Sequence, residues 1–339
     1  MSELYRPLRN SGCRIIDDLV FKGYRSLVLE NEKLLIHLLL DKGAEPIRWL
    51  HKPTDTDMIW ISHNGLGASH AMYADYQISY IGGWQELLPE VSYTSEYRGG
   101  TVHRGETAIT PWDYRIVKDE PDEIRVLLIN QIRSMPFRLE KLMIMASGSE
   151  TVRIEETVRN LSPTSALEAN WGHHLAFGRP FLGEDSTVSL SEGAIVCNPI
   201  TGESWDWPLM RQAGTVTDLS VMPSPGTERD LLYIAVPDAA YRLASPSKGL
   251  TLEVRWDRAV WPYLWYWQNF RADRNAPFFG CDYNIGLEMF NVPPKLTLAE
   301  AAERKLALVV PPGGAISSWL EVTTFQTLQE RQGKGGTAG

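Results

Sequence analysis

The chain has 339 residues, of which 43% are hydrophobic and 22% are charged, and its formal net charge is −9. This composition is typical of a folded globular protein and differs from that of a disordered chain. The acidic excess, without any run of lysines and arginines, argues against nucleic acid as a partner.

Residues 1–18 contain no apolar segment of the kind found in a signal peptide. The most apolar stretch, 33–41, is too short to cross a bilayer. We therefore expect a cytoplasmic protein with no membrane partner. Its cysteines, Cys13, Cys197 and Cys281, form no CxxC pair, so neither a disulfide framework nor a thiolate zinc site is predicted.

Short runs of aliphatic, β-branched and aromatic residues, separated by turn residues, recur along the chain and are typical of β-strands. They lie at 25–41, 123–134, 138–162, 249–257 and 305–325. The clearest helical pattern, at 297–308, follows the prolines of 292–294 and is short.

This pattern, without alternation of strands and helices, predicts an all-β fold: a large antiparallel β-sandwich with few short helices. No linker rich in Ser and Gly divides the chain, so we expect one domain over residues 1–328. Residues 329–339 are polar and glycine-rich and are expected to be a disordered tail.

Several familiar catalytic motifs are missing from the sequence. It contains no GxxxxGK[ST] phosphate loop, no HExxH zinc motif and no GxSxG nucleophile elbow. The carboxylates near His173 and His174 do not have the spacing of a metal site, which argues against a zinc centre as the function of the pair.

Ionisable residues in aromatic or glycine-rich surroundings mark three segments as candidate sites. Residues 80–114 include Trp84, Glu86, His103, Arg104 and Glu106; residues 169–184 include His173 and His174; and Glu288 is the lone carboxylate of the apolar run 283–292. An isolated carboxylate in such a run is costly unless it has a partner.

Aromatic residues dominate the segment 261–270. Trp261, Tyr263, Trp265 and Trp267 alternate, so on a strand they would share one face, with Gln268 beside them. Flat rings suit the apolar faces of pyranose sugars, and the same run would equally suit the core of a sandwich.

The order of these segments resembles the aldose 1-epimerase (galactose mutarotase-like) family. The matching motifs are GGWQELLPE, an element ending in PW, WGHHLAFG, and GLEMFNVPP before LVVPPGG, and they extend the likeness from about Gly43 to about Phe325. The resemblance implies a single large β-sandwich, a small-molecule carbohydrate as partner, a monomer or homodimer, and acid–base catalysis with no metal or organic cofactor.

The resemblance also implies roles for individual residues. His174 would protonate the ring oxygen, Glu288 would be the general base, and His173 would shape or orient its neighbour. An earlier histidine of the family binds the sugar, and His103 is the candidate. In this chain HRGE replaces the usual His-Gly-Glu, so Arg104 could take that place and bind a hydroxyl or an anionic substituent.

Together these features predict an epimerase that interconverts the α and β anomers of an aldose or aldose derivative, with an acid and a base placed across one ring. A non-catalytic carbohydrate-binding or sensing protein is the main alternative. A glycoside-cleaving enzyme is a weaker one, because it needs two suitably spaced carboxylates.

Structural roles compete with these functional ones. Of the two histidines, His173 is the one that we expect to have a structural role in the core. Glu288 could be a structural carboxylate paired with Arg255 or Arg258. Glu86 and Glu106 could bind sugar hydroxyls together with Trp84, Trp267 and Gln268, or could stabilise loops through salt bridges and backbone hydrogen bonds.

Overall fold

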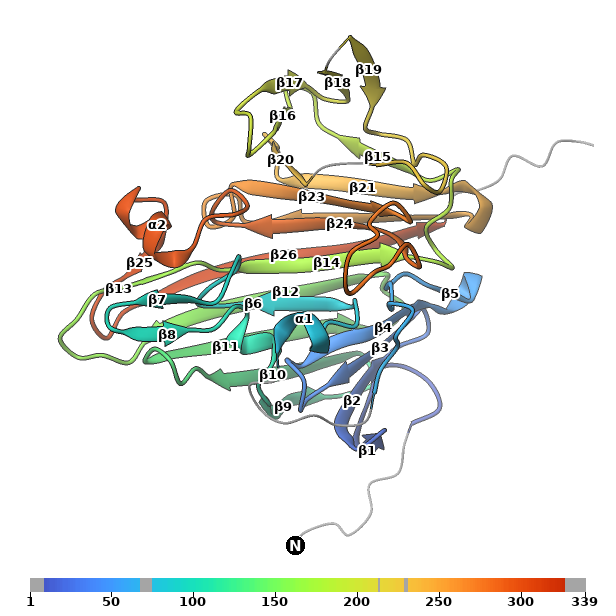
Figure 1. Cartoon of the computed structure of the whole chain (residues 1–339). Coiled ribbons are helices and arrows are strands. Elements are labelled where there is room, and N and C mark those ends of the chain that lie inside the picture. The colour runs from blue at the N-terminus through green and yellow to red at the C-terminus, as the bar shows by residue number, and fades with distance from the viewer. Residues whose placement is uncertain (1–8, 68–74, 213, 229–230, 327–339) are drawn as a thin grey trace, which may run out of the picture.

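The computed structural model describes residues 9–67, 75–212, 214–228 and 231–326. The predicted tail at 329–339 lies outside these ranges. Within them the protein is mainly antiparallel β-structure arranged in three larger sheets, as Figure 1 shows.

The five-stranded sheet comprises β1 (Arg14–Phe21), β2 (Tyr24–Glu30), β3 (Leu34–Leu39), β4 (Glu45–His51) and β5 (Thr56–Asp57) in that order. The eight-stranded sheet has the order β15 (Thr187–Leu190), β21 (Ala240–Ser245), β22 (Leu250–Trp256), β26 (Ala315–Gln326), β12 (Thr151–Asn160), β11 (Phe137–Ala146), β10 (Glu123–Gln131) and β9 (Asp113–Asp119). The seven-stranded sheet has the order β17 (Ser204–Asp206), β16 (Ile195–Cys197), β20 (Leu232–Ala235), β23 (Tyr263–Phe270), β24 (Tyr283–Phe290), β14 (Gly172–Gly178) and β6 (Trp84–Leu87).

Smaller elements connect and cover these sheets. Three two-stranded pairs are formed by β7 (Ser95–Tyr97) with β8 (Gly100–Val102), β13 (Leu167–Ala169) with β25 (Leu308–Val310), and β18 (Leu209–Gln212) with β19 (Thr215–Asp218). The helices are α1 (Tyr76–Ser79) and α2 (Leu298–Glu303), with 3₁₀ turns η1 (Lys52–Thr54), η2 (Glu106–Ala108) and η3 (Pro246–Lys248). A capping box of Thr297 and Glu300 fixes the start of α2.

The strands predicted from the sequence are confirmed. The segment 25–41 forms β2 and β3, and 138–162 forms β11 and β12. The helical pattern at 297–308 shortens to α2, which ends at Glu303 where Arg304 caps it and Lys305 takes a left-handed backbone conformation with φ of 58°. The strict alternation of buried and half-buried residues along β11 shows why such a sequence forms a strand with one face on the core.

The eight- and seven-stranded sheets pack face to face around the main hydrophobic core. The inner face of the seven-stranded sheet contributes Leu175, Phe177, Leu264 and Leu287 to it. The outer face of that sheet has its own apolar cluster, which includes Trp60, Tyr80, Ala176 and Trp265. Both faces of β14 and β24 are therefore covered, and every residue of these two strands is buried.

Candidate active site

A row of four side chains crosses the outer face of the seven-stranded sheet. Gln85 of β6 pairs with His174 of β14, and Glu288 of β24 pairs with Trp265 of β23. The pairing of β14 with β24 brings His174 beside Glu288. Because directly opposed residues on neighbouring strands point to the same face, all four side chains rise from the same side of the sheet.

A cavity of about 170 Å³ lies over this row. Its walls include His174 and Glu288 from the sheet, Tyr76 and Gln77 from α1, and Arg104 from the segment after β8. The remaining lining residues are mainly apolar: Tyr80, Leu231, Trp265, Trp267 and Phe278. Trp265 and Trp267 thus lie at the cavity, whereas Trp261 precedes β23 and packs in the core against Trp171.

His174 and Glu288 form the ionisable centre of the cavity. Nε2 of His174 lies 3.5 Å from Oε1 of Glu288, and Nδ1 lies 3.4 Å from the hydroxyl of Tyr80. The imidazole ring also makes an edge contact with Trp267, at 5.6 Å between ring centroids. Neither arginine weighed as a partner from the sequence reaches Glu288: Arg255 lies near Glu253, and Arg258 donates to the carbonyl of Pro237.

Burial determines the charge of both groups. It lowers the pKa of His174 to about 3, and the nearby positive charge of Arg104 acts in the same direction. Burial also raises the pKa of Glu288 well above its usual value, an effect that Arg104 partly opposes. Both shifts favour the uncharged forms, a neutral imidazole and a protonated carboxyl group, in which the pair holds one transferable proton on the glutamate.

Arg104 supplies the positive charge of the cavity. Its guanidinium lies over the ring of Tyr76 at 4.3 Å, and among the described residues its Nε has no hydrogen-bond partner. No carboxylate in the described part of the chain lies within ion-pair distance of it. The guanidinium is therefore available to a ligand in the cavity.

A buried chain of hydrogen bonds holds the platform beneath Arg104. The hydroxyl of Tyr76 donates to Oε1 of Gln85 at 2.5 Å, and Nε2 of Gln85 donates to Glu45 at 2.9 Å. Glu45 in turn pairs with the buried ammonium of Lys42. This chain ties α1 to β6 and fixes the aromatic ring on which the guanidinium lies.

The structure separates His103 from Arg104. Arg104 lines the cavity, whereas His103 is half-buried and is not among the described lining residues. Gly105, with φ of 53°, follows directly, and a Cβ there would meet the side chain of Leu87 at 2.6 Å. The sequence left open whether His103 or Arg104 binds the sugar. In the structure Arg104 is the one of the two that lines the cavity.

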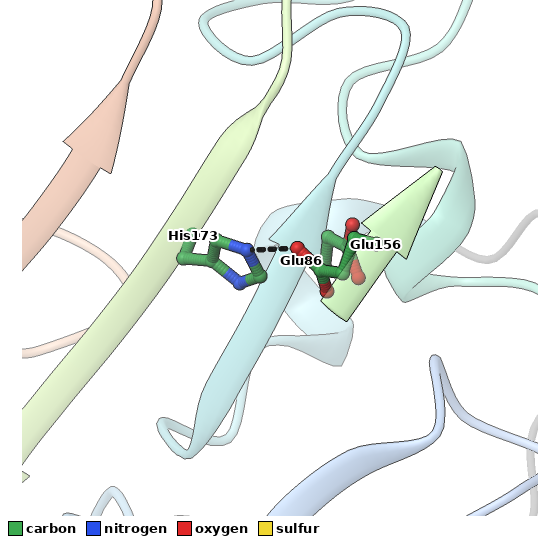
Figure 2. A group of neighbouring side chains, drawn as sticks. All are labelled: Glu86, Glu156 and His173. Carbon is green, nitrogen blue, oxygen red and sulfur yellow. Dashed lines mark hydrogen bonds and ion pairs between the residues drawn. The ribbon is translucent and has the colours of Figure 1, made fainter. Parts of the chain in front are cut away.

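Three other candidates lie on the opposite face of the sheet, inside the sandwich. Trp84 and Glu86 of β6 and His173 of β14 point inward because each is one residue away from a residue of the outer row. Nε2 of His173 bonds to Glu156 of β12, and the two atoms are 2.8 Å apart. Figure 2 draws this bond as a dashed line. The indole N–H of Trp84 donates to Nδ1 of His173 at 3.1 Å, so the imidazole is neutral with its proton on Nε2.

Lys141 of β11 completes this interior network. Its ammonium lies 2.6 Å from Glu86 and 3.7 Å from Glu156, and the indole N–H of Trp171 donates to Glu86 at 2.7 Å. Glu86, Glu156 and His173 place three ligand atoms within 4.8 Å of one another, a spacing that would suit a metal ion. The lysine ammonium supplies the cationic charge of this cluster, so we interpret it as an ion network between the two sheets.

Burial sets the pKa values in the network as well. It lowers the pKa of His173 to about 3 and raises the pKa of Glu156 to about 7. The pKa of Glu86 is also raised, first by burial and then by the charge of Glu156.

The two remaining candidates have separate positions. Glu106 is fully buried and accepts hydrogen bonds from the backbone N–H groups of Arg133 and Ser134, an arrangement that fixes a loop. Gln268 lines a second, larger hollow next to the cavity rather than the cavity itself. Trp267 lines both.

Sequence reasoning missed several cavity residues. Tyr76, Gln77, Tyr80, Leu231 and Phe278 lie on a short helix or in connecting segments, where no periodic pattern marks them. The sequence did offer a signal for Gln85. It is adjacent to the candidate Glu86, and of two neighbouring residues on a strand one must face away from the core.

Comparison with known proteins identifies the family and the fold. The family model described as "Domain of unknown function (DUF4432)" matches residues 22–322, and no curated protein matches the sequence. Within the described ranges no helix has the length and apolarity needed to span a bilayer.

Solved structures resemble the chain over most of its length. A candidate aldose 1-epimerase from Klebsiella pneumoniae has a TM-score of 0.68 and 14% identity, covering 93% of this chain and 84% of that one. A galactose mutarotase-like protein from Clostridium acetobutylicum has a TM-score of 0.65 and 13% identity, covering 93% and 99%. These likenesses confirm the predicted β-sandwich and its galactose mutarotase-like form.

Proposed function

Because the chain belongs to the DUF4432 family and has the galactose mutarotase-like fold, we propose, from the side chains of its cavity, that it is a carbohydrate epimerase. It interconverts the α and β anomers of an aldose or an aldose derivative by opening and closing the ring. His174 and Glu288 exchange the protons, and Arg104 and the aromatic residues bind the sugar.

The observation that carries this proposal is the 3.5 Å separation of Nε2 of His174 from Oε1 of Glu288. The anomeric hydroxyl and the ring oxygen are bonded to the same carbon, so the two groups that serve them must lie side by side. The sequence interpretation placed the acid and the base across the ring. The neighbouring arrangement suits two oxygens on one carbon better.

The charge state of the pair suggests how the protons move. Neutral His174 accepts the proton of the anomeric hydroxyl while protonated Glu288 donates its proton to the ring oxygen. The C1–O bond of the ring breaks, and a carbonyl forms at C1. After rotation about the bond next to C1, the ring oxygen attacks the other face of the carbonyl and both protons return. The number of protons on the pair is the same before and after each cycle.

A basic histidine and an acidic glutamate reverse the roles implied by the family resemblance, in which the histidine is the acid and the glutamate the base. Both orders use one proton shared by the two groups. The lowered pKa of His174 and the raised pKa of Glu288 favour the basic histidine and the acidic glutamate as the state that meets the incoming sugar.

The cavity also suits a single sugar ring. Trp265, Trp267 and Phe278 offer apolar surfaces to the C–H faces of a pyranose, and Arg104 offers N–H donors to a hydroxyl or an anionic substituent. Among the described residues that line the cavity, Glu288 is the sole carboxylate. Glycoside cleavage by two carboxylates therefore has no support in this site.

Anomeric exchange measured by NMR tests the proposal directly. Freshly dissolved aldoses, sugar acids and sugar phosphates are each mixed with the wild type, His174→Asn and Glu288→Gln. We expect faster exchange with at least one sugar, reduced in each variant by about a hundredfold or more. His37→Asn makes the same change on β3, away from the cavity, and should exchange like the wild type.

Other outcomes would count against the proposal. Exchange that persists in both variants would place the acid and the base elsewhere. Saturable binding of a sugar with no exchange by the wild type would favour a non-catalytic carbohydrate-binding protein.

A further inference from the structure

A groove of about 1170 Å³ adjoins the cavity of His174 and Glu288. The two spaces share Trp267 and Leu231 in their walls. The groove continues from there past the end of β23 to the β18–β19 hairpin, where Thr217 contributes to its lining. The cavity and the groove are therefore parts of one cleft, with a narrow end and a wide end.

The sizes of the two parts differ in a way that matters for the ligand. Pockets for drug-sized molecules typically measure about 300–1,000 Å³. The narrow end, at about 170 Å³, is small enough for a single sugar ring, whereas the groove is several times larger. A free monosaccharide bound for ring opening would leave the groove without a role.

The indole of Trp267 joins the two parts. Its ring lies 5.6 Å from that of His174 and 5.5 Å from that of Phe278, measured between centroids. An aromatic ring at this boundary offers a flat apolar surface to the next sugar unit as well as to the first.

Asn269 is the feature of the groove that most clearly calls for a ligand. It is only 3% exposed, yet neither its amide nitrogen nor its amide oxygen has a hydrogen-bond partner among the described residues. On β23 it lies two residues from Trp267, on the same face, and it contributes to the groove. A buried amide without partners is costly, and a hydroxyl group can satisfy both its donor and its acceptor.

The rest of the lining is also suited to a ligand with many hydroxyl groups. Thr217 and Asn275 offer hydroxyl and amide groups, and Asp273 and Lys295 add charges of both signs. Such a mixture favours hydroxyl-rich molecules over a strongly anionic or strongly apolar ligand.

From this cleft, and resting on the proposed function, we propose that the substrate is a reducing oligosaccharide. Its reducing-end ring occupies the cavity of His174 and Glu288, and at least one further sugar unit lies in the groove against Trp267 and Asn269. The reaction requires a free anomeric hydroxyl at the reacting ring. The further unit is consequently joined through another oxygen of that ring.

The test compares matched sugars in the NMR exchange assay. Glucose, galactose and mannose are each set against reducing disaccharides that carry the same sugar at the reducing end. We expect kcat/KM for at least one disaccharide to exceed that of its monosaccharide by about tenfold or more. Equal values for every pair would overturn the inference while leaving the epimerase proposal intact.

Two variants locate the effect in the groove. Asn269→Leu removes the amide at nearly constant volume, and Thr217→Trp fills the groove from the hairpin, where an added ring does not disturb the core. Each should lower kcat/KM for the disaccharide about tenfold and leave exchange of the monosaccharide unchanged. A loss shared equally by both sugars, in both variants, would contradict the inference.

Binding measured by calorimetry separates this inference from the proposed function. One outcome is that the protein exchanges no sugar but binds a disaccharide at least about tenfold more tightly than its monosaccharide, and that Asn269→Leu removes this difference. That outcome would support oligosaccharide binding in the groove and contradict the proposed epimerase activity. If neither exchange nor preferential binding of any disaccharide occurs, both are overturned.

Discussion

Oε1 of Glu288 lies 3.5 Å from Nε2 of His174 because the backbone below it leaves room for the carboxyl group. A Cβ atom on Gly286, two residues earlier on β24, would lie 2.1 Å from that same oxygen. Positions 286 and 288 lie on the same face of the strand. The proposed catalytic carboxyl group therefore occupies space that a side chain at position 286 would fill.

Gly286→Ala should therefore displace the carboxyl group of Glu288 while keeping the strand intact. Misplacement of a catalytic group by about 1 Å can cost about a hundredfold in rate, and we expect a loss of that order in kcat/KM for anomeric exchange. Gly100→Ala is the control, because a Cβ on this glycine of β8 meets no atom within 4 Å. Unchanged exchange in Gly286→Ala would show that the carboxyl position is not critical.

The pH dependence of exchange should report on Arg104. In the proposed active state His174 is neutral and Glu288 is protonated, so kcat/KM falls as the pH rises through the pKa of Glu288 and also falls as the pH drops toward 3. The charge of Arg104 lowers both pKa values. Arg104→Met should move both limbs of the profile to higher pH, whereas Arg104→Lys keeps the charge and should move them less.

The direction of that shift is the decisive result. An alkaline limb that stays in place, or moves to lower pH, in Arg104→Met would mean that Glu288 does not carry the proton that limits the rate. Profiles of kcat/KM recorded with one sugar from about pH 4 to about pH 10 would show it.

The interior ion network predicts a large effect on stability. Lys141→Met leaves Glu86 and Glu156 as buried carboxyl groups without their cation, and breaking a buried pair in this way costs about 3–5 kcal/mol. Urea unfolding followed by tryptophan fluorescence measures the change. Adding Glu86→Gln to the variant should recover part of the loss, since one unpaired acid is then removed.

A half-buried lysine at the protein surface provides the comparison. Lys118 pairs with Asp122 and Glu123 at the surface, and Lys118→Met should leave the unfolding midpoint unchanged. Equal losses in the Lys141 and Lys118 variants would contradict the assignment of the interior network as a structural element.

The stability of the protein should also depend on pH through Glu156. Its pKa is about 7 in the folded protein against an ordinary value of 4.5, so the folded state binds more protons than the unfolded state between these values. This contribution to the free energy of unfolding is fully present below pH 4.5 and is lost as the pH rises through 7. Glu156→Gln should remove that decline.

Urea unfolding at half-unit steps from about pH 4.5 to about pH 7.5 would measure it. The free energy of unfolding of Glu156→Gln should rise more steeply with pH, or fall less, than that of the wild type. Glu155→Gln, on the solvent side of the same strand, should keep the wild-type slope. Parallel curves for all three proteins would contradict the raised pKa of Glu156.

The fold was predictable because apolar and polar residues alternate along a strand when one of its faces is buried and the other is not. The segment 138–162 shows the alternation plainly and forms β11 and β12. β14 and β24 lack it because both of their faces are covered. For these two strands the sequence could indicate burial but could not say which residues face the cavity.

That ambiguity explains which candidate residues the structure separates. His173 and His174 are adjacent, as are Gln85 and Glu86, and only the packing of the sheets decides that His174 and Gln85 face outward. The lone carboxylate Glu288 stood out chemically and does lie beside His174. Tyr76 and Tyr80 were not predictable, because their place at the cavity depends on a four-residue helix held by tertiary contacts.

The paired histidines of β14 have a consequence for how the chain reaches its native register. If β14 slipped by one residue during folding, His174 could meet Glu156 in place of His173, so the imidazoles alone would not tell the two alignments apart. Leu175 and Phe177 would do so, since the slip would turn both out of the main core and put Ala176 and Gly178 in their place. The apolar residues that follow the histidines are thus the ones that discriminate against a misaligned strand, and with it a misdirected His174.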